Sequence, residues 1–76
     1  MKFKRITIDP DQMGGVPCIR HMRMPVVTVL KMVASGMTTE EIISEFPFLE
    51  SDDVREALLY AAVFLEERTL KVTPGL

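Results

Sequence analysis

Few side chains in this sequence have the chemistry of a catalytic or metal-binding site. The single histidine, His21, lies three residues after the single cysteine, Cys18. A tetrahedral zinc site takes four such ligands, and no further cysteine or histidine exists to complete one. Gly14-Gly15 lacks the spacing and the following helix of a phosphate-binding loop. We therefore interpret Cys18 as a small core residue and His21 as a turn residue. The prediction is a protein that is not an enzyme and takes no metal or cofactor.

The acidic pairs have a structural interpretation. Glu40-Glu41 follows two threonines, and Thr38 with Glu41 three residues later is the pattern of a capping box. Asp52-Asp53 follows Ser51, which is a favourable N-cap, and the helix dipole favours acidic residues in a first turn. We therefore predict helix starts at both pairs rather than general acid–base sites.

The elements that position these residues begin with a small β element. Residues 3–8 alternate partly and end at Asp9-Pro10, which predicts a short strand followed by a turn. A flexible loop over residues 11–17 ends at a proline. Residues 18–20 and 23–24 then read as two very short extended segments, so a small hairpin around His21-Met22 is expected.

Helical spacing replaces alternation from Pro25 onward. Pro25 suits a first helical turn, Gly36 a C-terminal stop, and Pro47 the end of a second helix. We predict three helices of roughly ten, eight and sixteen residues, the third over residues 52–67. This is a mainly α, trihelical helix-turn-helix of homeodomain-like or winged type with a small N-terminal β element. The single domain divides into residues 1–24 (β element and loop), 25–68 (three-helix core) and 69–76 (C-terminal tail).

Composition is typical of a folded protein rather than a disordered one. Of the 76 residues, 47% are apolar and 26% are charged. The longest charge-free apolar run, residues 57–65, is too short to cross a bilayer. One cysteine forms no intramolecular disulfide, and no signal peptide is visible, so a cytoplasmic protein without membrane attachment is expected.

Charge is distributed unevenly along the chain. The formal net charge is −2, but residues 1–31 carry six basic and two acidic side chains, whereas residues 32–76 carry three basic and nine acidic ones. Such asymmetry indicates a charged partner for one half, or a second copy of the chain; the alternative is chance in a short sequence.

The third predicted helix is apolar on most of its circumference. Val54, Leu58, Ala61 and Leu65 form a stripe that suits packing on the first two helices. Other apolar residues fall elsewhere on the helical wheel, and a helix that is apolar all round must be covered all round. We predict a homodimer that covers them; the alternative is cover by the N-terminal segment of the same chain. The predicted dimer residues are Leu59, Tyr60, Val63 and Phe64.

DNA contact has a partial basis in the residues. The N-terminal residues of the second motif helix reach base edges in a helix-turn-helix, and here most are acidic. Arg55 is the predicted base reader, with Ser51 beside it. Phosphates would be neutralised by cations of the N-terminal half, namely Lys2, Lys4, Arg5, Arg20 and Arg23.

Several stretches resemble one family in order and spacing, over roughly residues 5–66. The N-terminal stretches are Ile8-Asp9-Pro10, Gly14-Gly15-Val16-Pro17-Cys18-Ile19-Arg20 and Arg23-Met24-Pro25-Val26. The later ones are Val29-Leu30, Ala34-Ser35-Gly36, Thr39-Glu40-Glu41-Ile42-Ile43, Phe46-Pro47-Phe48-Leu49 and the segment of residues 53–62. Together they resemble the domain of unknown function four hundred and thirty-three. The family's hairpin usually reads Gly-Thr-Arg where this chain has His21-Met22-Arg23. Glycine there indicates a tight turn with positive φ, which histidine tolerates better than most residues but less freely than glycine, so a different hairpin tip is expected here.

The resemblance implies a function. Members are regarded as homeodomain-like helix-turn-helix proteins, and many look like VapB-type antitoxins encoded beside a PIN-like ribonuclease toxin. The expectation is an antitoxin-like DNA-binding protein of a type II toxin–antitoxin pair, which represses transcription of its operon and neutralises that toxin. The alternative is a dimeric protein–protein interaction module without DNA binding. Acidic residues would cover the toxin's basic groove, with these candidates: Glu40, Glu41, Glu45, Glu56, Glu66 and Glu67.

Overall fold

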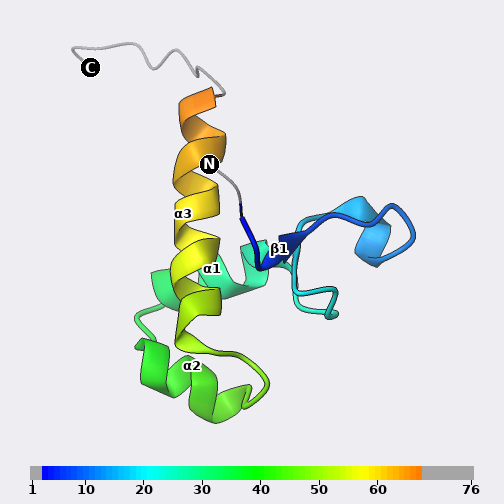
Figure 1. The fold of residues 1–76 in the computed structure, drawn as a ribbon. Helices are drawn as coiled ribbons and strands as arrows, with labels where there is room; N and C mark the ends of the chain where they lie inside the picture. The colour runs from blue at the N-terminus through cyan, green and yellow to red at the C-terminus, as the bar shows by residue number, and fades with distance from the viewer. Residues whose placement is uncertain (1–2, 68–76) are drawn as a thin grey trace, which may run out of the picture.

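Three helices and a small two-stranded sheet make up the fold of this computed structural model, which describes residues 3–67 (Figure 1). The predicted tail of residues 69–76 and the predicted phosphate contact Lys2 lie outside the described residues. The order of elements is the predicted one: β element first, then three helices. Within residues 3–67, the structure contains no helix of the length and apolarity that a membrane span requires.

The N-terminal β element is shorter than the sequence predicts. Strand β1 (Ile6–Thr7) pairs antiparallel with β2 (Cys18–Ile19), so that Ile6 faces Ile19. A short 3-10 turn, η1 (Met13–Gly15), lies in the loop between them. The strand predicted over residues 3–8 contracts to two residues, because β2 ends at the reversal that follows Ile19. The predicted second extended segment, residues 23–24, is reduced to an isolated bridge between Cys18 and Pro25.

The reversal after β2 is a tight turn with two left-handed residues. Arg20 has φ 43° and His21 has φ 60°, and the N–H of Met22 donates to the carbonyl of Ile19 at 2.7 Å. Positive φ at both central positions is the signature of a type I′ turn, which usually recruits Asn or Gly. His21 thus adopts the positive φ that the family's glycine indicates at this position, and Arg20 shares it. This conformation fixes where the Arg20 side chain leaves the backbone.

Helices α1 (Val26–Ala34) and α2 (Thr39–Glu45) form as the local signals predict, with one difference at Pro25. Pro25 caps α1 from outside instead of occupying its first turn. Gly36, with φ 98°, ends α1: its N–H donates to the carbonyl of Val33, and the N–H of Met37 donates to the carbonyl of Met32, the Schellman arrangement. The capping box of α2 is confirmed, since the Glu41 N–H donates to Thr38 Oγ1 and the Thr38 N–H donates to Glu41 Oε1.

Helix α3 (Ser51–Glu67) begins one residue earlier than predicted. Ser51 is its first helical residue rather than its N-cap, because the carbonyl of Glu50 already accepts from the N–H groups of Asp53 and Val54. The Asp53 carboxylate accepts from the Glu50 N–H at 2.8 Å. The N–H of the residue before α3 is thus satisfied by the Asp53 side chain, whereas the sequence predicted a cap by the Ser51 side chain.

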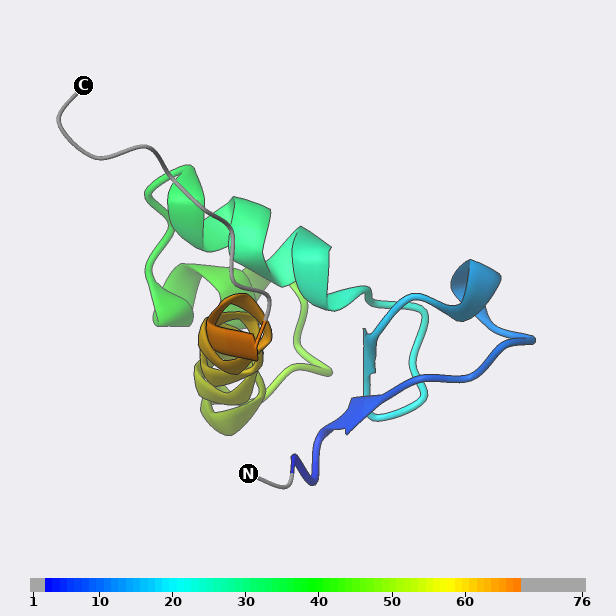
Figure 2. The ribbon, with the colours of Figure 1, turned by 90° about the horizontal axis from the view of Figure 1, so that it is seen from above.

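The core lies where α1, α2 and β2 meet the first half of α3 (Figure 2). Its buried side chains are Ile19, Met24, Val26, Val29, Ile42, Leu49, Val54 and Ala57. The predicted packing stripe on α3 is wrong at two positions: Leu58 is 44% exposed and Leu65 is 60% exposed. Ala57 is fully buried in their place, and Tyr60 packs against the core. The buried face is rotated toward Ala57 and Tyr60, which leaves Leu58 and Leu65 outside.

Candidate functional site

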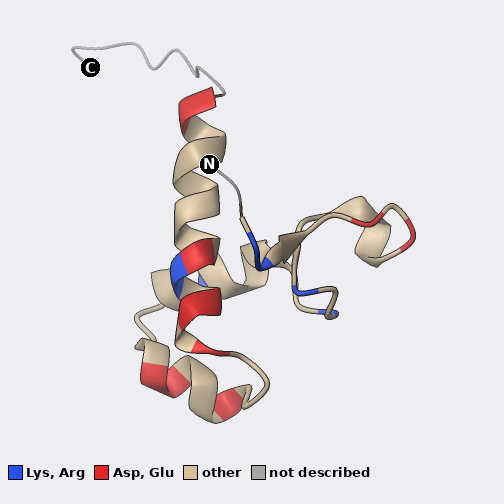
Figure 3. Ribbon diagram, in the orientation of Figure 1, with Lys and Arg blue, Asp and Glu red and all other residues tan. Residues whose placement is uncertain are grey.

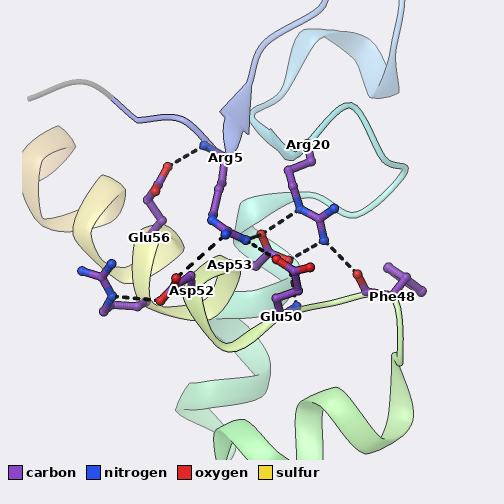
Figure 4. Close-up of polar contacts among 8 residues, drawn as sticks. Arg5, Arg20, Phe48, Glu50, Asp52, Asp53 and Glu56 are labelled. Atoms are coloured by element: carbon purple, nitrogen blue, oxygen red, sulfur yellow. Dashed lines mark hydrogen bonds and ion pairs between the residues drawn. The ribbon is translucent and has the colours of Figure 1, made fainter.

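A buried aspartate with two arginine partners joins the β element to α3 (Figure 4). The Asp53 side chain is fully buried. Arg20 binds it in a bidentate manner, with Nε donating to Oδ1 at 3.0 Å and Nη2 donating to Oδ2 at 2.7 Å. Arg5 Nη1 donates to Oδ1 at 3.0 Å from the other side. With the N–H of Glu50, four hydrogen bonds satisfy both carboxylate oxygens, which a buried charge requires.

The two arginines extend this cluster to the surface. Arg5 Nη1 also donates to Glu50 Oε1 at 2.6 Å, and the Arg5 N–H donates to Glu56 Oε1 at 2.6 Å. Arg20 Nη2 also donates to the carbonyl of Phe48 at 2.8 Å, in the turn before α3. We call Arg5, Arg20, Glu50, Asp53 and Glu56 the arginine–aspartate cluster. It attaches both strands' ends to the start of α3.

The cluster shifts the ionisation of its members. Burial alone would raise the pKa of Asp53, but hydrogen bonds from Arg20, from the Glu50 N–H and from Arg5 outweigh it, so the pKa falls below its ordinary value of 3.8. The pKa of Arg5 is raised, first by its hydrogen bond with Glu50 and then by that with Asp53. The pKa of Arg20 is raised by its hydrogen bond with Asp53. All three groups are therefore charged at neutral pH. Burial raises the pKa of the Cys18 thiol, which disfavours the reactive thiolate.

Stability should depend on this carboxylate in acid. Because the pKa of Asp53 is lower in the folded than in the unfolded chain, its contribution is fully present above the unfolded value of about 4 and is lost as pH falls through the folded value. We expect the free energy of unfolding to fall on acidification below pH 4. The ¹³C shift of the Asp53 carboxyl, followed through the titration, checks the cause. A midpoint at or above 3.8 contradicts the ion pairing.

Three of the predicted DNA-binding residues, Arg5, Arg20 and Arg55, are paired with the protein's own carboxylates. Arg5 and Arg20 are engaged in the cluster, so their charge is already neutralised by carboxylates. The Arg55 side chain is 66% exposed and forms an ion pair with Asp52 at 3.5 Å, one turn earlier in the helix. The remaining predicted contacts are exposed on three separate segments: Lys4, Arg23 and Ser51.

Acidic side chains instead collect on α2 and the start of α3 (Figure 3). We call the exposed residues Glu40, Glu41, Glu45, Glu50 and Asp52 the acidic face. Of the predicted toxin-binding residues, three lie on it: Glu40, Glu41 and Glu45. Glu41 also serves in the capping box, and Glu56 accepts from Arg5. Glu66 and Glu67 lie at the opposite end of α3, so the structure does not bring all six together.

The predicted dimer residues are only partly available. Leu59, Tyr60 and Val63 are half-buried, and Phe64 is 41% exposed. The Phe3 ring meets the Tyr60 ring edge to face at 5.3 Å between centroids, so the N-terminal segment covers part of this side of α3. Next to it, an apolar groove of about 380 Å³ lies between α1 and α3; its rim includes Val16, Val27, Leu30, Phe64 and Leu65. The homodimer remains a prediction. Leu58 and Leu65, which were not among the predicted dimer residues, are more exposed than any of the four that were.

Sequence reasoning missed the arginine–aspartate cluster. Arg20 and Asp53 are separated by 33 positions, and Arg5 and Asp53 by 48. Neither pair has a helical or strand spacing that would join them. The available signal was chemical: Asp53 precedes Val54 and Ala57 on the buried side of an amphipathic helix, where a charged residue requires a partner.

Comparisons with known proteins identify a family. Residues 6–61 match the model described as "Protein of unknown function (DUF433)". Over 56 residues the chain is 38% identical to the uncharacterized protein y4eO of Sinorhizobium fredii (strain NBRC 101917 / NGR234). The aligned segment is 74% of this chain and 25% of y4eO. It also resembles the crystal structure, at 2.00 Å resolution, of a DUF433 member protein from Anabaena variabilis ATCC 29413. That likeness has a TM-score of 0.75 at 30% identity and covers 83% of this chain and 62% of the other.

The chain therefore spans a quarter of the length of y4eO and less than two thirds of the Anabaena chain. The family model covers most of the three helices and both strands, and the relatives agree with it in sequence and in fold. This chain belongs to the DUF433 family of proteins of unknown function.

Proposed function

We propose that this domain is a protein-interaction module of antitoxin type, whose acidic face binds the basic surface of a nucleic-acid-handling protein. The observation that carries the proposal is the position of Arg5 and Arg20. Their guanidinium groups bind Asp53 and Glu50, so they neutralise the protein's own carboxylates instead of phosphates. Of the two functions that the sequence predicts, the interaction module is the one that this geometry supports.

The acidic face strengthens the proposal. In a DNA-binding helix-turn-helix, the N-terminal residues of the second motif helix enter the major groove. Here the first turn of α3 holds the exposed Asp52, and the preceding helix α2 holds Glu40, Glu41 and Glu45. Phosphates repel this surface, whereas a lysine- and arginine-rich groove attracts it and speeds its association. A PIN-like ribonuclease, the partner that the family resemblance implies, must hold an RNA polyanion and fits this description.

DNA binding and operon repression are the competing function, and one experiment separates the two. The chain is co-expressed with the product of the neighbouring reading frame, and separately titrated with duplex DNA of its own promoter at about 50 mM and about 200 mM salt. We expect a stoichiometric protein complex that dissociates as salt rises, and no retention on the duplex at either salt concentration. Promoter retention that falls steeply between the two salt concentrations, without a protein complex, would overturn the proposal.

A further inference from the structure

The exposed side of α3 carries a stripe with opposite charges at its two ends. Arg55, Leu58, Ala62, Leu65 and Glu66 are all exposed, whereas Leu59, Ala61 and Val63 between them are half-buried. We call these five exposed residues the α3 stripe. Arg55, Leu58, Ala62 and Leu65 have the spacing of the a and d positions of a heptad, and Glu66 follows at the next position, so all five lie on one helix face. The stripe is apolar in the middle. Its N-terminal end carries the basic Arg55, which is 66% exposed and also pairs with Asp52 at 3.5 Å, and its C-terminal end carries the acidic Glu66.

We propose that a second copy of this chain packs on the α3 stripe in antiparallel orientation, so that Arg55 of each copy pairs with Glu66 of the other. In that register Leu58 faces Ala62 of the partner subunit, and Arg55 lies level with Leu65 and next to Glu66 of the partner subunit. A two-fold axis near residue 60 repeats every contact, as an isologous interface requires. The small side chain of Ala62 lets the two helices approach closely beside each leucine.

Charge complementarity selects this occupant and this direction. A parallel pair would place Arg55 against Arg55 and Glu66 against Glu66, which is repulsive at both ends. The antiparallel pair converts both repulsions into ion pairs. Glu66 and Glu67 also lie at the C-terminal end of α3, where the helix dipole disfavours negative charge, and the last turn that the structure describes, ending at Glu67, holds no basic residue. An arginine of the partner subunit supplies a positive charge there.

The stripe is continuous with the apolar groove between α1 and α3. Leu65 belongs to both, and Val27 on the groove's rim is 52% exposed. A second copy on the stripe therefore also covers the Leu65 edge of the groove, which removes apolar surface from water beyond the two leucines. The acidic face lies mainly on α2 and meets the stripe at Asp52, which is 3.5 Å from Arg55. Exchanging the charges of Arg55 and Glu66 changes no residue of the acidic face, so the pairing is tested separately from the proposed function.

The test is a charge-swap series measured by sedimentation equilibrium. Arg55→Glu or Glu66→Arg alone places like charges at both ends of the pair, and each should raise the dimer dissociation constant about tenfold or more. The double variant R55E/E66R restores opposite charges without changing net charge, and should return the dissociation constant to that of the natural chain. Arg23→Glu and Glu45→Arg make the same single charge changes outside the stripe and should have no effect.

Loss of folding can be told apart from loss of the dimer. Arg55 and Glu66 are exposed, and far-UV circular dichroism reports the helix content of each variant. Leu58→Ser and Leu65→Ser, both at exposed positions, provide a second measurement and should also weaken the dimer. A natural chain that stays monomeric at about 1 mM, where even millimolar association would show, overturns the proposal. So does a dimer in which the double variant is no tighter than the single ones, because that excludes the antiparallel register.

Discussion

Replacing Asp53 with alanine is expected to lower the free energy of unfolding by about 2–4 kcal/mol. The substitution removes the acceptor of four hydrogen bonds, three of them from charged arginine groups, and leaves Arg5 and Arg20 without their shared partner. The loss stays within this range because both arginine side chains, 27% and 34% exposed, can regain water. In a domain of this size, whose total stability is about 4–11 kcal/mol, such a loss is a large share.

Urea denaturation followed by circular dichroism measures this effect. Asp52→Ala is the matched control, because Asp52 is the preceding residue of the same helical turn but is 55% exposed and makes only distant ion pairs. We expect the control to change stability by less than about 0.5 kcal/mol. If the Asp53 variant shows no cooperative transition, the milder Arg20→Lys should still fold and be destabilised, because lysine keeps the charge but loses the bidentate geometry. Equal midpoints for the Asp52 and Asp53 variants would contradict a stabilising cluster.

Reversing the charge of the acidic face is expected to weaken binding to a basic protein partner and to allow binding to duplex DNA. The double variant E40K/E45K changes two exposed residues of α2 and moves the formal net charge from −2 to +2. Binding to a basic partner should weaken at least about tenfold, because attraction becomes repulsion at two positions. Retention on duplex DNA should appear at low salt, with a slope of up to about 2 units in log affinity against log salt for two new phosphate contacts.

A second pair of substitutions separates position from net charge. D11K/E67K raises the net charge by the same amount at exposed residues outside the acidic face. It should leave binding to the basic partner within about twofold of the natural chain, since rim charges distant from a contact act mainly through screened fields. Glu41 is left unchanged in both variants because its carboxylate closes the capping box of α2. If both pairs weaken the partner equally, overall charge and not the acidic face governs the interaction.

The ends of the helices were predictable because each is specified by a few residues that are close together in the sequence. A threonine and a glutamate three residues apart specify the cap of α2, and Gly36 specifies the end of α1. The presence of a hairpin around residue 21 was also predictable, although its two left-handed residues, Arg20 and His21, are not glycines. Each of these features depends on a few neighbouring residues whose hydrogen bonds leave little choice.

The buried face of α3 was not predictable from periodicity. A helix that is apolar on most of its circumference satisfies several rotations about its axis equally well, and the stripe through Leu58 and Leu65 fitted as well as the one through Ala57. The arginine–aspartate cluster decides between them. Asp53 must meet Arg5 and Arg20, which turns Ala57 inward and leaves Leu58 outside. The same contact explains why two arginines assigned to DNA from the sequence lie against α3.

The coupling energy between Arg20 and Asp53 tests most directly the claim that these arginines belong to the protein's own structure. A double-mutant cycle with Arg20→Ala, Asp53→Ala and the double variant measures it through unfolding free energies, with Arg23→Ala as the neighbouring control. The cluster predicts a coupling of about 1–3 kcal/mol for the Arg20 cycle and a value near zero when Arg23 replaces Arg20. Additive effects of the Arg20 and Asp53 substitutions would contradict it, and would leave Arg20 available for phosphate contact.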